Sequence, residues 1–445
     1  MKHATKLKLD DFVIDSRDGE WGEGNENSGL VKCYLIRGTD FSRLPNKDVD
    51  LPQRWIKNHL VDRKRLQTND LIFEMAGGTA TQSTGRSAIL TKRFFQEHGD
   101  FPVLCASFCR HLRLNSDHCP EYFYYYLQAL YVSGYMSVFN IQHTGVSRFQ
   151  FTTFKRFTEF NLPPLPIQHK IAAVLSAYDD LIENNNRRIG LLEKMGEELY
   201  REWFVRLRFP GHESTKIVKG VPEGWTVKRM GDVIGYYIGG GWGEEFSNVS
   251  NPVGAYVIRG TDIPKFQKSY SNLPPFRHHA ESNFRSRKMS PGDIVFEVSG
   301  GSKDQLLGRS LMLTKGMLDL LQGNVIPASF CKLLRPNVSS IYLSRFLQEY
   351  YATGLVGTFE IKSTGISNYQ FEAFLKYQTI TIPENAILQR FEQVLDPIDV
   401  KKDALLRSNA NLADSRDRLL TRLMSGKIDL ESLDIAFPPS MQEAA

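Results

Sequence analysis

At 445 residues, this chain is too long for a single hydrophobic core, so we expect two or three domains. Apolar residues make up 41% of the sequence and the net charge is +5, which permits nucleic-acid binding without arguing for it. The sequence shows no apolar run of membrane-spanning length, no signal-peptide pattern and no disulfide framework among its five cysteines. We therefore expect a cytoplasmic protein with no membrane partner.

The two halves of the chain repeat one another. The matching strings include Trp-Gly-Glu (21–23 and 242–244), Ile-Arg-Gly-Thr-Asp (36–40 and 258–262) and Ala-Ser-Phe-Cys (106–109 and 328–331). The repeat has a period of about 220 residues and predicts that nearly the whole chain is one unit present twice.

Short β-branched and aromatic runs, bounded by Gly and Asn or Asp, predict several strands in each module, for example at 32–36 and 71–74. Helical periodicity appears at 121–131 and again at 341–351. Because the strands do not alternate regularly with helices, we expect mixed α+β modules in which strands distant in sequence meet.

A long heptad pattern follows each module. In the proline-free segment 168–204, side chains from Ile171 to Trp203 recur at alternating steps of three and four, and a second seam runs from Leu388 to Leu423. A narrow apolar seam on so long a helix cannot bury itself, so we predict that the two helices pair antiparallel. The alternative is two amphipathic helices, each packed on its own globular core.

Two asparagines interrupt these seams. An antiparallel alignment that places Asn185 opposite Asn409 also places Ile171 opposite Leu423. Sliding by one heptad would set each amide against an apolar residue, at a cost of about 1–3 kcal/mol. We therefore predict that Asn185 and Asn409 face each other and fix the register.

We find no catalytic signature, neither a phosphate-binding G-x-x-x-x-G-K-[ST] loop nor a G-x-G-x-x-G turn. Cysteines and histidines between 105 and 119 suggest zinc, but Leu333 replaces His111 in the second copy. We expect no catalytic residue, no metal and no cofactor.

Glycine-rich loops with basic members occur in both copies, at 76–86 and 299–309, and a second pair lies at 143–148 and 362–367. Glycine lets backbone amides approach a phosphate, Arg and Lys supply charge, and Gln can read a base edge. The residues that we predict to contact DNA are Arg37, Gln82, Arg86, Arg148, Arg259, Lys303, Arg309 and Lys362. For Arg37 and Arg259 the alternative is a structural pairing with Asp40 and Asp262.

Further segments carry a family resemblance: Pro-Pro-Leu-Pro-Ile-Gln-His-Lys-Ile (163–171), Val-Pro-Glu-Gly-Trp (221–225) and Leu-Leu-Thr-Arg-Leu-Met-Ser-Gly-Lys-Ile (419–428). With these segments, nearly the whole chain resembles a specificity subunit of a type I restriction–modification system. The first module lacks the Pro-Glu-Gly-Trp opening, and His169 stands where the family more often has Gln or Glu.

The resemblance implies an α+β fold with two target-recognition domains joined by a long antiparallel two-helix coiled coil. It also implies a non-catalytic chain whose partners are double-stranded DNA, two methyltransferase subunits and endonuclease/translocase subunits. The expected parts are a first recognition domain (1–166), a central helix (167–207), a second recognition domain (208–385), a C-terminal helix (386–427) and a tail (428–445).

Two similar but non-identical modules predict an asymmetric, bipartite DNA target with an unspecified spacer. A helix of about 37 residues is on the order of 55 Å long, enough to reach half-sites about one DNA turn apart. Three alternatives stay open: an enzyme such as a nuclease or fused methyltransferase, a non-DNA interaction scaffold with duplicated binding modules, and a specificity subunit of a related restriction–methylation system.

Overall fold

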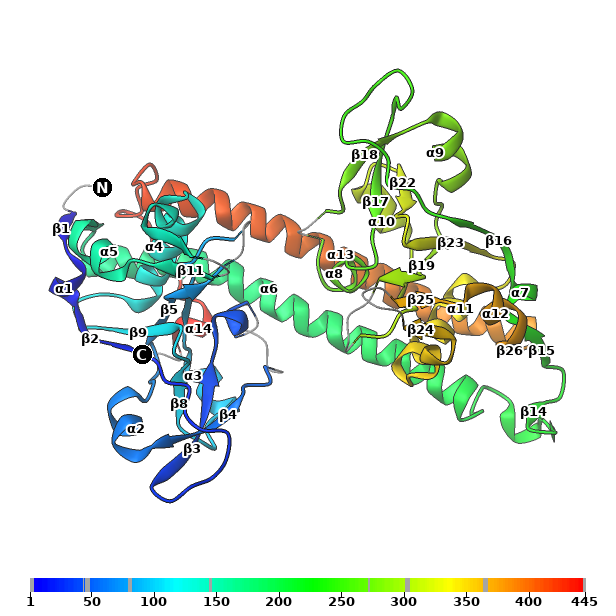
Figure 1. Ribbon diagram of the computed structural model, residues 1–445, viewed down its shortest axis with the longest axis horizontal. Helices are drawn as coiled ribbons and strands as arrows, with labels where there is room; N and C mark the ends of the chain where they lie inside the picture. The colour runs from blue at the N-terminus through cyan, green and yellow to red at the C-terminus, as the bar shows by residue number, and fades with distance from the viewer. Residues whose placement is uncertain are drawn as a thin grey trace. The chain divides into compact units, whose positions relative to one another are not determined.

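The computed structural model describes residues 4–42, 44, 49–78, 82–143, 146–270, 273–300, 305–362 and 367–442. They form two compact units. Unit 1 combines the chain up to Glu183 with the chain from Leu412 onward, and unit 2 is Asn184–Asn411. Figure 1 shows the elements of both.

Within its described residues, unit 1 holds four sheets. Their strand orders are β1 (Thr5–Leu7)–β12 (Phe160–Leu162); β2 (Val13–Asp18)–β9 (Cys109–Leu114)–β5 (Leu71–Glu74)–β7 (Ser87–Ile89); β4 (Gln53–Lys57)–β3 (Leu30–Ile36)–β8 (Val103–Cys105); and β10 (Asn140–His143)–β11 (Val146–Phe149)–β6 (Ala76–Gly77). The pairs are antiparallel except β3 with β8. The short helices are α1 (Leu9–Phe12), α2 (Asn58–Lys64), α3 (Lys92–Glu97), α4 (Pro120–Val132), α5 (Phe151–Phe157) and, near the C-terminus, α14 (Pro439–Gln442).

Unit 2 repeats these sheets in the same order. They are β15 (Thr226–Arg229)–β26 (Thr379–Ile382); β16 (Ile234–Gly239)–β23 (Cys331–Pro336)–β19 (Ile294–Glu297)–β21 (Ser310–Met312); β18 (Phe276–His279)–β17 (Val253–Ile258)–β22 (Val325–Pro327); and β24 (Glu360–Lys362)–β25 (Ser367–Tyr369)–β20 (Ser299–Gly300). A hairpin of β13 (Ile217–Val218) and β14 (Val221–Pro222) precedes them. The short helices are α7 (Met230–Val233), α8 (Ile263–Lys268), α9 (Glu281–Arg287), α10 (Lys315–Leu320), α11 (Ser340–Ala352) and α12 (Phe371–Tyr377). The matching orders confirm the α+β repeat.

Equivalent residues build both units. Thr91 caps α3 by accepting a hydrogen bond from the Phe94 amide, and Thr314 caps α10 in the same way. In the core, Phe73 of β5 stacks on Phe154 of α5 with ring centroids 6.0 Å apart. Phe296 of β19 stacks on Phe374 of α12 at 5.7 Å. All four of these rings are fully buried, so the same aromatic contact packs a short helix against the four-stranded sheet of each unit.

The two long helices are α6 (Leu165–Tyr200), which continues into a π-helical turn at Arg201–Val205, and α13 (Asn385–Met424). In unit 1, Ile171 and Leu175 of α6 share one hydrophobic cluster with Leu420 and Leu423 of α13. In unit 2, Trp203 lies against Phe391, with ring centroids 5.7 Å apart. The predicted antiparallel pairing is therefore present in each unit.

Asn185 and Asn409 meet in unit 2. The Asn185 amide nitrogen donates a hydrogen bond to the Asn409 side-chain oxygen at 2.9 Å, and both residues are buried. Asn409 in turn donates to the side-chain oxygen of Asn186 at 2.8 Å. The contact that the heptad alignment predicted is present, and its role in fixing the register stays a prediction.

The cysteines and histidines between 105 and 119 were the residues considered for zinc. Within the described ranges, no three His, Cys, Asp or Glu side chains are grouped so that they could hold a metal ion. Burial raises the pKa of Cys105 to about 12, which disfavours the thiolate form that binds zinc. In the same part of the chain, no helix is long and apolar enough to cross a membrane.

His111 is buried on β9 and lies 3.3 Å from Asp15. Burial lowers the pKa of its imidazole. The unfolded chain, with a histidine pKa of about 6.5, therefore binds a proton at a higher pH than the folded chain does. Stability from this residue is present above about pH 6.5 and is lost as the pH falls through that value towards the lower folded pKa.

We expect His111→Leu, which copies Leu333 of unit 2, to reduce the stability difference between pH 7.5 and pH 5.5. Urea unfolding at both pH values measures it, with His59→Leu on the exposed surface of α2 as the control. An unchanged pH dependence in His111→Leu would contradict the prediction.

Candidate nucleic-acid interface

The two sequence-predicted loops of each module come together in one small sheet. In unit 1, Arg148 of β11 lies opposite Ala76 of β6 on one side and Ile141 of β10 on the other. In unit 2, Asn368 of β25 occupies the equivalent place, opposite Ser299 and Ile361. Strand segments that are about 70 residues apart in sequence thus lie in one sheet, and the same pairing occurs in both modules.

Glycines shape this sheet. Gly77 has a φ of +138° and Gly300 a φ of +118°, values that side-chain-bearing residues rarely adopt. Each is the last residue of its short strand. The backbone at these two positions therefore favours glycine, whether or not the amides also approach a phosphate.

The exposed polar side chains on or beside these sheets include Gln82 and Arg148 in unit 1, and Lys362 and Asn368 in unit 2. The Asn368 side-chain oxygen accepts a hydrogen bond from the Ser299 hydroxyl at 2.9 Å. Equal positions thus carry Arg148 in one unit and Asn368 in the other. These residues can present different donors and acceptors to a ligand from one shared scaffold.

Arg86 and Arg309 are held inside their units. Arg86 donates to Glu74 at 2.9 Å through Nε and to the Gly38 carbonyl at 2.9 Å through Nη2. Glu74 is only 2% exposed, and its hydrogen bond raises the pKa of Arg86. Arg309 repeats the arrangement on Glu297 at 2.8 Å, where burial opposes its charge but the carboxylate still raises its pKa. The geometry gives both arginines a role within the fold, and a DNA contact by either stays a prediction.

Arg37 and Arg259 adopt the pairing that was raised as their alternative. Arg37 binds Asp40 through Nε at 3.0 Å and Nη2 at 2.9 Å, and Arg259 binds Asp262 through both groups at 2.8 Å. The two arginine side chains remain 38% and 41% exposed. Each is therefore anchored but still presents an edge to solvent. Lys303 lies outside the described residues.

A tryptophan–arginine pair that the sequence did not indicate occurs in both units. The Arg54 guanidinium lies 4.5 Å from the centre of a Trp21 ring, and Arg277 lies 4.8 Å from Trp242. Both tryptophans are about 40% exposed. The repeated Trp-Gly-Glu string was the available signal, but only the strand pairing shows which arginine lies over each ring. An exposed aromatic ring with a cation is a surface on which a base can stack.

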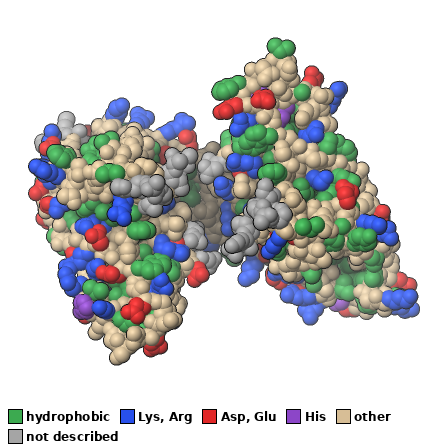
Figure 2. Space-filling view, in the orientation of Figure 1, with side chains coloured by type: hydrophobic (Ala, Val, Ile, Leu, Met, Phe, Trp, Pro, Cys, Tyr) green, Lys and Arg blue, Asp and Glu red, His purple; other side chains and the backbone are tan. Residues whose placement is uncertain are grey.

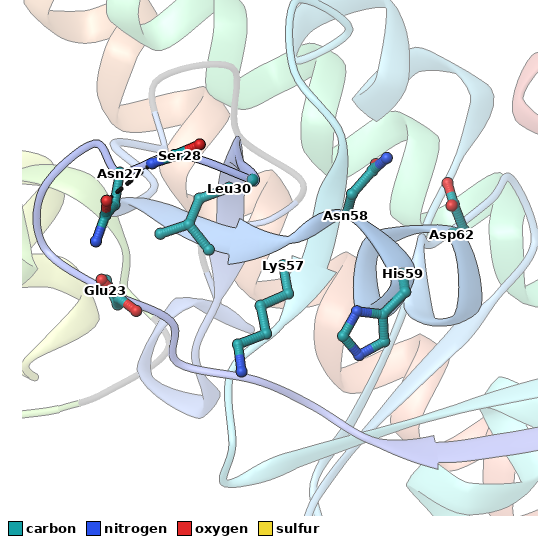
Figure 3. A pocket seen from close by; sticks show the side chains of 9 residues that line it. Glu23, Asn27, Ser28, Leu30, Lys57, Asn58, His59 and Asp62 are labelled. Atoms are coloured by element: carbon teal, nitrogen blue, oxygen red, sulfur yellow. Dashed lines mark hydrogen bonds between the residues drawn. The ribbon is translucent and has the colours of Figure 1, made fainter.

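A polar hollow of about 530 Å³ opens between the β2–β3 loop and the start of α2 (Figure 3). Lys57 and His59 line it, but so do Glu23 and Asp62. A second hollow in unit 2 carries five carboxylates, from Asp319, Glu392, Asp396, Asp399 and Asp403. Mixed or acidic linings are poorly suited to phosphate. Figure 2 shows that Lys and Arg side chains are spread over the visible surface rather than gathered in one patch.

Comparisons with known proteins find a matching family, curated relatives and a solved structure of similar fold. Residues 59–194 match the family described as the type I restriction modification DNA specificity domain. The chain is 28% identical to the type I restriction enzyme MjaIX specificity subunit of Methanocaldococcus jannaschii over 337 residues, which is 70% of each chain. It is 22% identical to the putative MjaX specificity subunit of the same organism, over 85% of this chain and 82% of the relative. The S subunit of a type I system from M. genitalium has the same fold, with a TM-score of 0.52 and 14% identity over 95% of this chain and 96% of that one.

Proposed function

We propose, since this chain belongs to the family of type I restriction–modification specificity subunits, that it reads an asymmetric, bipartite DNA target for partner enzymes and catalyses nothing itself. The observation that carries this proposal is the small sheet present in both units, which exposes Arg148 in one and Asn368 at the equal position of the other. One scaffold with different side chains suits two different half-sites.

The parts of the chain take separate roles in this proposal. Residues 1–166 and 208–385 are the target-recognition domains, 167–207 and 386–427 are the helices that space them, and 428–445 is a tail. Two methyltransferase subunits and endonuclease/translocase subunits would assemble on the chain in the cytoplasm.

Within each domain, the exposed residues of the small sheet are the main candidates for base and phosphate contacts. Gln82 and Arg148 serve this role in the first domain, and Lys362 and Asn368 in the second. The stacked Trp21–Arg54 and Trp242–Arg277 pairs would extend each surface. Arg37 and Arg259 would add charge from the edge that their aspartates leave exposed.

A gel-shift experiment tests the proposal. The purified chain and its methyltransferase partner are incubated with a pool of genomic fragments, at a salt concentration that weakens non-specific binding. We expect a reproducible subset of fragments to be retained. Equal retention of all fragments, or of none, would favour a non-DNA scaffold with duplicated binding modules.

A further inference from the structure

In each unit, a short helix of the module donates a hydrogen bond to an aspartate of a long helix, and the two aspartates occupy the same position in the repeat. Asp179 follows Val-Leu-Ser-Ala-Tyr in α6, and Asp399 follows Val-Leu-Asp-Pro-Ile in α13. The Tyr125 hydroxyl of α4 donates to Asp179 at 2.5 Å, and Arg345 of α11 donates to Asp399 at 2.6 Å. Tyr125 and Arg345 are themselves equivalent, each the sixth residue of its helix.

The arginine that neutralises the aspartate comes from a different element in each unit. In unit 1 it is Arg416 of α13, whose Nη1 donates to Asp179 at 2.5 Å. In unit 2 the position equivalent to Arg416 is Gly196 of α6. A Cβ at Gly196 would lie only 3.2 Å from the guanidinium of Arg345. The glycine therefore leaves the space that Arg345 fills.

The asparagine layer has the same complementary asymmetry. Asn185 of α6 pairs with Asn409 of α13. The residue of α13 equivalent to Asn185 is Leu405, and the residue of α6 equivalent to Asn409 is Ile189. Leu405 and Ile189 are buried in one hydrophobic cluster. Each long helix therefore carries one amide and one apolar side chain, arranged to match the other helix.

Pairing between two copies of the same helix would break both matches. In the observed register, two α6 helices would set each Asn185 against an Ile189 and each Asp179 against a Gly196. Each amide would then lose its partner, and each carboxylate would lose its arginine and keep only the Tyr125 hydroxyl. Two α13 helices would set each Asn409 against a Leu405 and bring Arg345 and Arg416 together at one Asp399. Buried polar groups without partners, and like charges in contact, disfavour both assemblies.

We propose that the seam between α6 and α13 is a heterospecific interface, which accepts the other repeat of this chain and rejects the same repeat from a second copy. Its consequence is that the two halves of one chain pair with each other, and that two copies do not join through identical halves. The link between this pairing and an asymmetric rather than a palindromic DNA target rests on the proposed function. The pairing preference itself does not.

The first test measures exchange between copies. A protease recognition sequence is inserted in the exposed Lys219–Gly220 turn of the full-length chain. The folded protein is then cut there, which gives a first segment that contains α6 and a second segment that contains α13. Two preparations that carry different N-terminal tags are mixed, exchanged in mild denaturant and returned to buffer. We expect each tagged first segment to co-purify with a second segment. Little of the first segment that carries the other tag should be recovered with it. Recovery of both tags together at the level expected for random pairing would overturn the proposal.

The same experiment can reverse the preference. Ile189→Asn together with Gly196→Arg makes α6 complementary to itself, because it supplies the partner amide and the missing arginine. We expect recovery of the second tag to rise at least about tenfold, the change that about 1.4 kcal/mol produces. Gly190→Arg with Leu191→Asn is the matched control, since both of those positions are exposed on the same helix. Equal recovery in variant and control would count against the proposal.

A stability measurement on the uncut chain gives a second, independent readout. Gly196→Arg should lower the Tm, because the new side chain collides with Arg345. Adding Arg345→Tyr recreates the Tyr, Asp and Arg arrangement of unit 1 and should restore most of the loss. A double variant no more stable than Gly196→Arg alone would show that the two arrangements are not interchangeable, and would overturn the inference.

Discussion

Alanine at Arg86 or at Arg309 will destabilise its unit rather than remove only a surface charge. Each arginine is the partner of a glutamate that is about 2% exposed, Glu74 or Glu297. Removing one member of a buried ion pair leaves the other charge without compensation, at a cost of about 3–5 kcal/mol. We expect a loss of unfolding free energy of that size in urea denaturation.

Two controls separate this cost from a general effect of losing an arginine. Arg148→Ala removes the same group from an exposed position and should leave the unfolding midpoint nearly unchanged. The double variant Glu74→Met, Arg86→Met removes both charges and should lose less stability than Arg86→Ala. If Arg86→Ala unfolds at the wild-type midpoint while DNA affinity falls, then Arg86 is a DNA contact and the structural interpretation is wrong.

Arg148→Ala and Lys362→Ala should each reduce DNA affinity by about tenfold and leave the Tm unchanged. Both side chains are exposed on the small sheets, so their removal creates no cavity and leaves no buried charge. A residue that contacts a phosphate should also lower the slope of log K against log salt by about one. Fluorescence anisotropy over a salt series measures both quantities.

Lys6→Ala is the matched control, because the Lys6 side chain is 75% exposed on β1, a strand of a different sheet of unit 1. Lys6→Ala should leave both the DNA affinity and the slope of log K against log salt close to those of the wild-type chain. A fall in Tm with unchanged DNA affinity for Arg148→Ala or Lys362→Ala would assign those residues to the structure of their sheet instead.

The repeat and the helix pairing could be predicted because they depend on patterns local to the sequence. Matching strings identify the two modules without any knowledge of the fold. The spacing of Asn185 and Asn409 in their heptads is enough to place them in one layer, and the structure pairs them at 2.9 Å.

The role of each arginine could not be predicted in this way. Glu74 and Arg86 lie twelve residues apart, and only the pairing of β5 with β7 places the carboxylate against the guanidinium. The same limit applies to the two glycine-rich loops, which the sequence presents separately and the β6–β11 pairing joins. It applies also to Gly196. The need for a residue without a side chain at this position follows only from the nearby guanidinium of Arg345, which the sequence does not place there.

Selection of bound sequences from a random DNA pool, by the chain with its methyltransferase partner, tests the central proposal most directly. We expect two specified blocks separated by a spacer of fixed length and unspecified sequence. Arg148→Ala should relax one block and Lys362→Ala the other. A single continuous block, or relaxation of the same block by both variants, would contradict it.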